Sequence, residues 1–207
     1  AVLPQTRFGL LALALPRRGG LELAKLLYEG MLPLAEEFDL AIAGGDTNSW
    51  DGPLVISITL LGRVTVRGPL RRDGAKPDDR ILVTGSFGGS ILGRHFDFQP
   101  RVREALLLHE RYELHAGIDV SDGLSIDLMH LCEESRCGAV LRTDRIPVSD
   151  DARRVDSVML KHNLPSVMLK HNLHGERADE PTPLDHALGD GEDFELILAA
   201  PPAEAQR

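Results

Sequence analysis

One local design occurs three times in this chain: an apolar, strand-like stretch runs into a glycine-rich turn that carries carboxylates. The three segments are "GGDT" at 44–47, "DVSDG" at 119–123 and "GDGED" at 189–193. Glycine permits tight turns and lets a ligand approach the backbone closely. Carboxylates on such turns can converge without long flexible stems, and Mg²⁺ prefers oxygen ligands. The pattern predicts a divalent-cation site that uses Asp46, Asp119 and Asp122.

A simpler interpretation competes with this one. Aspartate and glycine are common turn residues, and aspartate is a favoured helix N-cap. Asp122 could therefore cap the helix that the spacing of Leu124, Leu128 and Leu131 predicts. One acidic turn alone would favour turn chemistry, whereas three of them at strand ends favour a functional site.

The alternation of strand-like and helical patterns predicts an α/β fold, with α+β layers of strands and helices. In the first part of the chain we expect strands at 8–16, 40–43 and 53–66 and a helix at 19–39. The apolar stripe of that helix would contain Leu23, Leu26, Leu27, Met31 and Leu34. Further on we expect a strand and then a helix within 81–93, a helix at 102–114, a strand and a helix within 117–135, and a final strand near 194–201.

The segment 67–80 is basic and then rich in turn residues, which indicates a domain boundary. We expect a first domain at 1–68 and a second at 69–207, with a variable insert near 150–186. The insert contains "SVMLKHNLP" (157–165) followed at once by "SVMLKHNLH". A repeat this short cannot bury a face of its own, so we interpret it as a duplication or surface insertion.

Composition excludes several classes of protein. A net charge of −9 argues against a nucleic-acid partner, which normally selects a basic face. It does not exclude anionic ligands, because bound cations can make a small site positive. No apolar run approaches the ~18 residues that a membrane span needs. Two cysteines are too few for a disulfide framework and indicate a reducing compartment, the cytoplasm. They also lack the second ligand pair of a structural zinc site.

Two further segments suggest contacts with phosphate, each with an alternative. The glycine-rich "TGSFGGS" (84–90) could cradle a phosphate at a helix N-terminus, or it could simply allow tight packing. Arg71 and Arg72 could bind a nucleotide phosphate bidentately, or they could belong to a solvated linker. Ser121 has no evident His–Asp relay, so we do not expect a serine nucleophile.

Four longer segments carry a resemblance to a known family. They are "AGGDTNSWDGPLVISITLLG", "RRDGAKPDDRILVTGSFGGS", "DVSDGLSIDLMHLCEESRCGA" and "GDGEDFELI". In this order they resemble motifs of the thiamine-monophosphate kinases, which share a superfamily with aminoimidazole ribonucleotide synthetase and selenophosphate synthetase. The resemblance extends over about residues 8–200, and 150–186 match poorly.

The resemblance implies a fold and an activity. The first domain would contribute strands to a dimeric barrel, and the second would be a sheet with packed helices. The activity would be ATP-dependent phosphorylation of thiamine phosphate to thiamine diphosphate, without a covalent enzyme intermediate. The implied partners are ATP, thiamine phosphate, Mg²⁺ and a second copy of the chain. Because both substrates are polyanions, bound cations and positioned groups would do most of the work.

The resemblance also assigns residues, motif by motif. It implies that Asp46, Asp119 and Asp122 bind the metal. It implies that ATP contacts Gly45, Asp46, Arg72 and Ser121. Glu192 would hold the thiamine end of the substrate, and a carboxylate suits a cationic thiazolium ring on electrostatic grounds as well. No residue is expected to act as a covalent or acid–base catalyst.

The chain also departs from the family. An upstream "GDD"-type acidic turn and a segment that helps to form the thiamine pocket have no counterpart here. We therefore expect the chain to be incomplete at both ends and inactive alone. Two alternatives stay open: another ATP-using member of the superfamily, or a non-catalytic fragment that binds nucleotide or dimerises.

Overall fold

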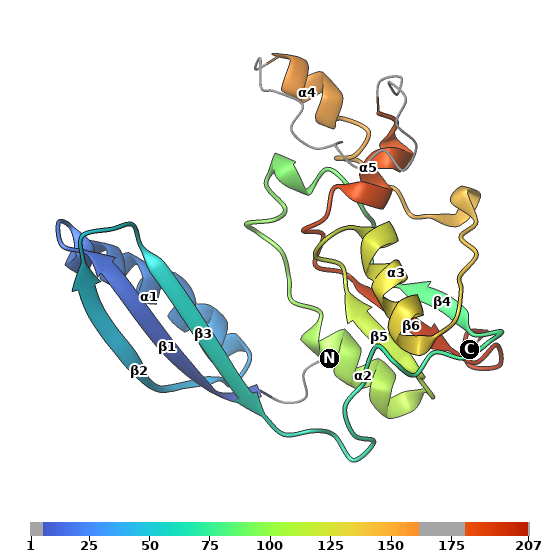
Figure 1. The fold of residues 1–207 in the computed structure, drawn as a ribbon, viewed down its shortest axis with the longest axis horizontal. Helices are drawn as coiled ribbons and strands as arrows, with labels where there is room; N and C mark the ends of the chain where they lie inside the picture. The colour runs from blue at the N-terminus through green and yellow to red at the C-terminus, as the bar shows by residue number, and fades with distance from the viewer. Residues whose placement is uncertain (1–5, 162–180, 207) are drawn as a thin grey trace. The chain divides into compact units, whose positions relative to one another are not determined.

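The computed structural model describes residues 6–161 and 181–206 and divides into two compact units, Leu3–Gly68 and Pro69–Arg207 (Figure 1). The division falls at the start of the basic, turn-rich segment. The second copy of the duplicated nonapeptide lies outside the described residues, so its interpretation as a surface insertion stays a prediction. Within the described ranges, none of the helices has the length and apolar character needed to cross a bilayer.

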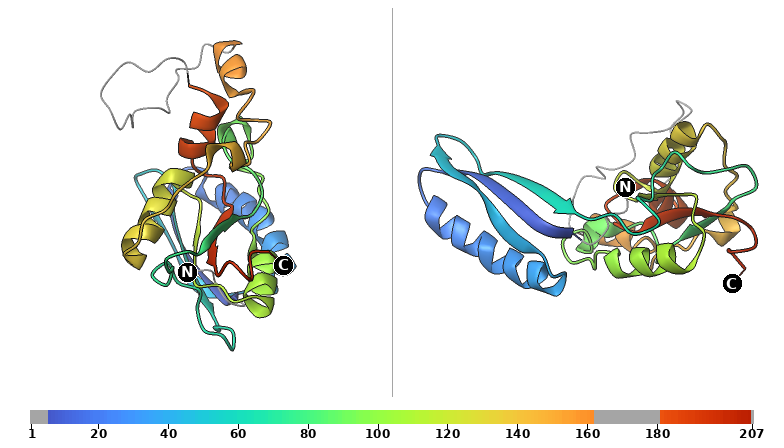
Figure 2. Two further views of the ribbon diagram at one scale, coloured as in Figure 1. Left: turned by 90° about the vertical axis from the view of Figure 1, so that its right-hand side faces the viewer. Right: turned by 90° about the horizontal axis from the view of Figure 1, so that it is seen from below.

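The first unit is a three-stranded sheet with one helix. Its elements are β1 (Thr6–Pro16), α1 (Gly20–Glu37), β2 (Ala41–Trp50) and β3 (Val55–Gly62). The strand order is β2-β1-β3, with β1 parallel to β2 and antiparallel to β3. The helix connects the two parallel strands and packs along the sheet (Figure 2).

The central strand β1 has one buried and one exposed face. Leu11, Leu13 and Leu15 are buried under α1, while Phe8 and Leu10 on the other face are 51% and 39% exposed. This period of two is the signature of a half-buried strand. The prediction of a strand at 8–16 is confirmed, and the strand is buried on one face only.

The helix α1 lies where the sequence predicts it, but its apolar stripe was only partly identified. Leu27 and Met31 pack on the leucines of β1. Leu26 and Leu34 are exposed by 64% and 47%, because they lie off the face that α1 turns to the sheet. The buried position on that face near the end of the helix is Ala35.

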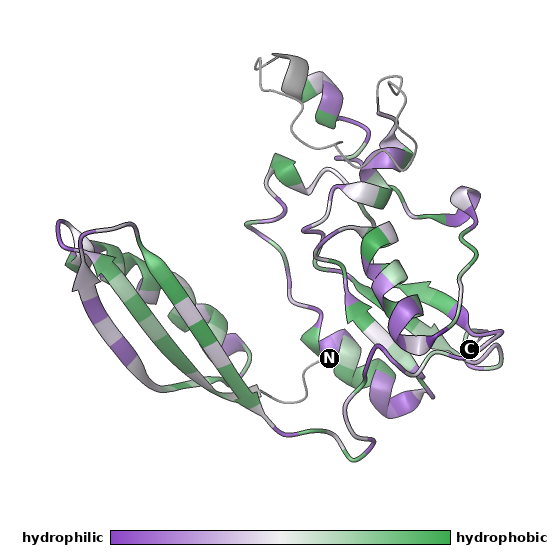
Figure 3. Ribbon diagram, in the orientation of Figure 1, coloured by the Kyte–Doolittle hydropathy of each residue, from purple (hydrophilic) through white to green (hydrophobic). Residues whose placement is uncertain are grey.

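The strand β2 corrects the interpretation of the first acidic turn. "GGDT" does not form a turn after a strand at 40–43, because β2 continues through it from Ala41 to Trp50. The irregularity is a register shift against β1, opposite Gly9 and Leu10. Figure 3 shows that β1 and β3 are largely hydrophobic, whereas β2 carries hydrophilic segments.

The second unit is a three-stranded antiparallel sheet with helices on both faces. Its strands are β4 (Arg80–Val83), β5 (Ala116–Asp119) and β6 (Leu196–Ala200), in the order β4-β6-β5. Its α-helices are α2 (Val102–Arg111), α3 (Leu124–Ser135), α4 (Val155–Lys161) and α5 (Pro183–Gly189), and there are short 3₁₀ turns at Ser90–Leu92 and Thr143–Arg145. This mixed arrangement of small sheets and helices agrees with the predicted fold class.

The central strand β6 explains how the helices are distributed. Ile197 and Ala199 belong to the core formed with α3, whereas Leu196 and Leu198 belong to the core formed with α2. A strand that is covered on both faces reads as a continuous apolar run rather than an alternating one. The sheet is therefore the middle layer, and the loop between β5 and α3 emerges at its edge.

The glycine-rich segment 84–90 does not start an α-helix. Only a three-residue 3₁₀ turn, Ser90–Leu92, follows it, so the helix expected within 81–93 is wrong. Gly88 and Gly89 both have a positive φ, and an added Cβ would lie 2.7 Å from the backbone of Ala187 and 2.4 Å from that of Asp151. The glycines therefore serve close packing between chain segments.

Candidate functional site

The acidic loop between β5 and α3 is the centre of the candidate site. The strand ends at Asp119, α3 begins at Leu124, and Gly123 takes a positive φ of 115° between them. The side chains of Asp119 and Asp122 are exposed, and Ser121 is partly buried. The loop thus presents two carboxylates and one hydroxyl at the edge of the sheet.

A third aspartate, absent from the sequence-based prediction, fixes this loop. Asp127 is only 2% exposed. Its Oδ2 accepts hydrogen bonds from the backbone N–H groups of Ser121 (2.9 Å), Asp122 (2.9 Å) and Gly123 (3.2 Å). The N-cap of α3 is Gly123, without a side-chain cap, so the alternative role of Asp122 as the cap is wrong.

The pKa of Asp127 reflects the negative charge that surrounds it in the acidic loop. Burial raises the pKa of Asp127, and the neighbouring carboxylates of Asp122 and Asp119 raise it further, although the backbone N–H groups act in the opposite direction. Negative charge is therefore concentrated at this loop. A bound cation would relieve that repulsion.

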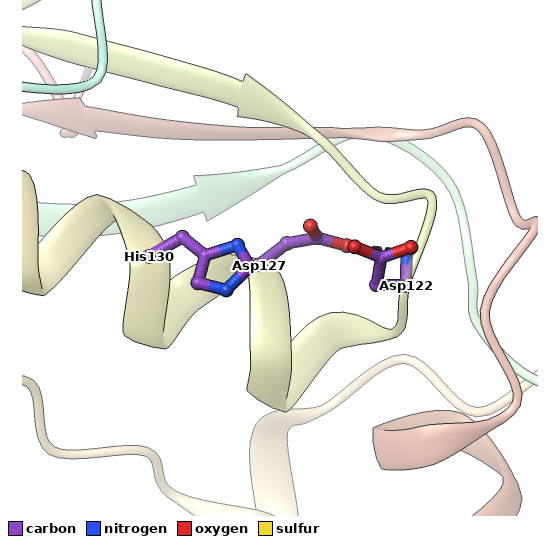
Figure 4. Close-up of side chains that lie close together, drawn as sticks. All are labelled: Asp122, Asp127 and His130. Carbon is purple, nitrogen blue, oxygen red and sulfur yellow. Dashed lines mark hydrogen bonds between the residues drawn. The ribbon is translucent and has the colours of Figure 1, made fainter.

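Donor atoms suitable for a metal lie close together at this point. Asp122, Asp127 and His130 each offer one ligand atom, and these atoms lie within 4.8 Å of one another. Figure 4 shows the three side chains along the loop and the first turns of α3. Two carboxylates and an imidazole can hold a divalent cation.

A pocket of about 490 Å³ surrounds this cluster. Its charged lining comprises Arg71, Arg72, Asp73, Asp119, Asp122, Asp127 and Glu134. Each arginine has a carboxylate partner: Arg71 pairs with Asp73, and Arg72 approaches Glu134 at 3.4 Å. Five carboxylates outnumber two guanidinium groups, so the pocket suits a polyanion only together with cations.

The third acidic turn lies directly beside the second. The N–H of Glu192 donates to the carbonyl of Ser121 (2.8 Å), and the N–H of Phe194 donates to that of Val120 (2.9 Å). Glu192 and Phe194 have positive φ values of 52° and 51°, which are unusual for residues other than glycine. Glu192 is exposed, and the ring of Phe194 stacks on Phe98 with centroids 4.2 Å apart.

The other two carboxylates of "GDGED" have internal partners. Both oxygens of Asp193 lie 3.0 Å from the N–H of Gly88, and Arg94 forms an ion pair with the same carboxylate. Asp190 accepts from the N–H of Gly89 at 2.7 Å. Burial raises the pKa of Asp193 to about 6, against the lowering effect of Gly88 and Arg94. The chain's own carboxylates thus occupy these amides, which favours packing over a phosphate cradle.

A buried histidine adjoins this region. Nδ1 of His186 contacts Asp190 at 2.8 Å, and Nε2 contacts Asp156 at 3.2 Å. The hydrogen bond with Asp190 is the main reason why the pKa of His186 is raised, and Asp156 adds to it, whereas burial opposes it. We call this group the His186 clamp. No motif in the sequence indicated it.

Gly45 and Asp46 belong to the first unit. Asp46 is exposed and pairs with Ala12 in the ladder between β1 and β2. A Cβ at Gly45 would lie 1.8 Å from the carbonyl oxygen of Leu11, so only glycine fits there. The expected meeting of Asp46 with Asp119 and the rest of the pocket involves the other unit and stays a prediction.

The second unit therefore brings together most of the residues expected from the resemblance. Arg72, Asp119, Ser121 and Asp122 line one pocket, and Glu192 is hydrogen-bonded beside it. The prediction missed Asp127, His130 and Glu134. The available signal was the spacing of polar residues along one side of the helix that follows "DVSDG".

Comparison with solved structures defines the class of fold. The chain is similar to AaThiL complexed with AMPPCP and TMP, with a TM-score of 0.69, 22% identity and coverage of 96% of this chain and 63% of that one. The thiamine-monophosphate kinase from Stenotrophomonas maltophilia matches with a TM-score of 0.70 and 27% identity, and the match covers 99% of this chain and 65% of that one. The E. coli hydrogenase maturation protein HypE matches with a TM-score of 0.72 and 18% identity, and the match covers 97% of this chain and 60% of that one. The chain has the fold that these proteins share.

Within that class, the sequence relatives point to the thiamine-monophosphate kinases. The chain is 43% identical to the thiamine-monophosphate kinase of Rhodopirellula baltica over 196 residues, which are 95% of this chain and 55% of that protein. It is 31% identical to the Salmonella typhimurium enzyme of the same name over 194 residues, 84% of this chain and 52% of that protein. The chain is thus a relative of the thiamine-monophosphate kinases, as the motifs indicated, and spans about half the length of these curated relatives. No family model matches it.

Proposed function

We propose that the protein to which this chain belongs transfers a phosphoryl group from ATP to thiamine phosphate and so forms thiamine diphosphate. The observation that carries the proposal is the pocket in which Arg72, Ser121, Asp119 and Asp122 converge, in a chain 43% identical to a thiamine-monophosphate kinase. A neighbour of the same fold is complexed with AMPPCP and TMP, and AMPPCP is an analogue of ATP. An ATP-dependent kinase is the activity that this pocket and these relatives support best.

The residues of the pocket fit Mg²⁺ as the cofactor. Asp119 and Asp122 are exposed carboxylates at the end of one strand, and Asp127 is buried beside them. Oxygen ligands on a rigid loop are what Mg²⁺ uses together with substrate phosphates. When bound, the ion would supply positive charge that neutralises phosphate groups, which is the chemistry that two polyanionic substrates need.

The remaining groups would bind and orient the substrates. Arg72, whose side chain is half exposed, can form paired hydrogen bonds with a phosphate of ATP. The hydroxyl of Ser121 can donate to another phosphate oxygen. Glu192, next to Ser121, offers a carboxylate to the cationic ring of thiamine phosphate. Positioning and charge neutralisation account for phosphoryl transfer without a covalent intermediate.

Two residues of the first unit complete the proposal. Asp46, exposed on β2, would be a further metal ligand and would contact ATP. Gly45, whose missing side chain allows β2 to approach Leu11, would contact ATP through its backbone. Both roles come from the family resemblance.

We also propose that the first unit pairs with a second copy of the chain. The register places the apolar side chains of Phe8, Leu10, Val55 and Leu61 on the face of its sheet opposite α1, where they are 39–52% exposed. Exposed apolar strands are favoured sites of association, and a barrel shared between two copies would cover them. Light scattering should give the mass of a dimer, and a monomer at micromolar concentration would contradict this proposal. We place the protein in the cytoplasm, which suits its two free cysteines.

Binding and turnover test the proposed function separately. Titration calorimetry of the 207-residue chain with AMPPCP and Mg²⁺ should release heat, and Asp119→Asn should weaken the binding. The protein extended to the length of its relatives should consume ATP only when thiamine phosphate is added. The decisive contrary result is ATP consumption that another acceptor supports and thiamine phosphate does not. Binding without turnover in the extended protein would leave only a nucleotide-binding role.

A further inference from the structure

The segment that carries Arg72 is held by the last turn of α3. Residues 71–75, "RRDGA", contain a bend at 72–73, and we call this segment the arginine turn. The hydroxyl of Ser135 donates to the carbonyl of Arg72 at 2.8 Å and accepts from the N–H of Ala75 at 3.1 Å. One side chain therefore connects both ends of the turn to the helix.

The other contacts of the arginine turn fix its start and its middle. The N–H of Gly117 donates to the carbonyl of Arg71 at 2.9 Å. A Cβ at Gly74 would lie 2.2 Å from the carbonyl oxygen of His115, so the arginine turn passes close against the start of β5. In the described part of the chain, Ser135 supplies the hydrogen bonds of the Arg72 carbonyl and the Ala75 amide.

The side chain of Arg72 has no comparable anchor. It is half exposed, and its only ion pair among the described residues is the 3.4 Å contact with Glu134. An exposed pair at that distance contributes little and does not fix a long side chain. Ser135 therefore holds the backbone from which the side chain of Arg72 extends into the pocket.

We propose that Ser135 is a positioning residue for nucleotide binding, which orients Arg72 toward the phosphates of ATP through the arginine turn. The inference rests on the proposed function, because it takes Arg72 as a ligand of ATP. It adds a residue that does not line the pocket. Since Ser135 follows Glu134 on α3, the same helix that begins at the acidic loop ends at the arginine turn, so one rigid element sets the distance between the metal ligands and Arg72.

A double-mutant cycle on the 207-residue chain tests this role, with calorimetric titration of AMPPCP and Mg²⁺ as the measurement. Ser135→Ala should weaken binding about fivefold, the effect of losing one or two neutral hydrogen bonds. Ser135→Thr, which keeps the hydroxyl, should restore binding. In an Arg72→Ala background, Ser135→Ala should have no further effect, because the two residues act in series.

Ser125 provides a matched control on the same helix. Its hydroxyl donates to the carbonyl of Leu188 at 2.8 Å, away from the arginine turn. Ser125→Ala should leave the affinity for AMPPCP unchanged, and circular dichroism should show that all variants are folded. Equal effects of Ser135→Ala with and without Arg72 would overturn the inference in favour of a general structural role. If Ser135→Ala leaves the affinity for AMPPCP unchanged, the positioning role of Ser135 is overturned and the proposed function is not. If the wild-type chain does not bind AMPPCP, the proposed function is refuted as well.

Discussion

The acidic loop should depend on Asp127 more than on the aspartates that it presents. Asp127→Ala removes the acceptor of three backbone N–H groups, at Ser121, Asp122 and Gly123. Water can reach the first two, which are partly or fully exposed, whereas Gly123 is buried and its N–H would have no partner. Hydrogen bonds to a charged group are worth roughly 1.5–3 kcal/mol each, and an unsatisfied buried donor costs roughly 1–3 kcal/mol.

Repulsion between Asp127 and its neighbouring carboxylates reduces the stability that Asp127→Ala would lose. The pKa of Asp127 is raised by burial and by Asp122 and Asp119, so the ionised carboxylate lies in an unfavourable place, and its removal relieves that penalty. Together these effects predict a net loss of about 2 kcal/mol in the free energy of unfolding of the second unit. Asp127→Asn keeps one acceptor oxygen and removes the charge, so it should lose about 1 kcal/mol or less.

The assay is urea denaturation followed by circular dichroism and by tryptophan fluorescence. Trp50 is the chain's single tryptophan and lies in the first unit, so its fluorescence transition should stay where it is in the wild type. The transition seen by circular dichroism should shift to lower urea in Asp127→Ala. A variant as stable as the wild type, or an alanine variant no weaker than the asparagine variant, would refute the assignment of Asp127 as the residue that fixes the loop.

Three further predictions concern residues away from the pocket. Gly45→Ala places a Cβ 1.8 Å from a backbone oxygen of β1 and should lower the stability of the first unit by more than about 3 kcal/mol. The tryptophan fluorescence transition should shift to lower urea, and an unchanged transition would contradict this prediction. Arg101→Met leaves Glu195, only 5% exposed, without its cation and should cost about 3 kcal/mol in thermal or urea unfolding; a neutral result would show that the pair is dispensable. The raised pKa of His186 means that its protonated form stabilises the fold fully below about pH 6.5 and that this stability is lost as pH rises through the raised value. His186→Gln should flatten stability curves above pH 6.5, a window that lies above the pKa of about 6 of Asp193, and a wild type that gains stability there would contradict the sign.

Local patterns predicted the elements whose burial is regular. β6 is a continuous apolar run covered by helices on both faces, and α3 repeats apolar residues at helical spacing. In these two elements the sequence period matches the period of burial, whereas β1 is apolar along residues 8–16 although only one of its faces is buried. The stripe of α1 was partly wrong because exposed leucines such as Leu26 lie next to the buried face.

Glycine was the ambiguous signal. "GGDT" was interpreted as a turn, whereas Gly45 allows close approach between two parallel strands that are distant in sequence. "TGSFGGS" was considered as a phosphate cradle or as close packing, and the amides of Gly88 and Gly89 donate hydrogen bonds to Asp193 and Asp190 of the third acidic turn, which favours close packing. Both outcomes depend on contacts between segments far apart in the chain, which a local pattern does not contain.

The carboxylates of the second and third acidic turns, together with Asp127, separate into two groups by burial and partners. Asp127 and Asp193 are 2% exposed and accept hydrogen bonds from backbone amides. Asp119, Asp122 and Glu192 are exposed, and in the described part of the chain their carboxylates have no hydrogen-bond or ion-pair partner.

A carboxylate that shapes a loop has to be buried against the amides that it holds, whereas one that binds a ligand has to stay accessible and unpaired until the ligand arrives. Aspartate and glutamate side chains therefore serve two purposes within the same short turns, which is why turn chemistry and function could not be separated from the sequence alone. By this criterion the exposed group should hold cations and substrate, and substitutions there should change binding far more than stability.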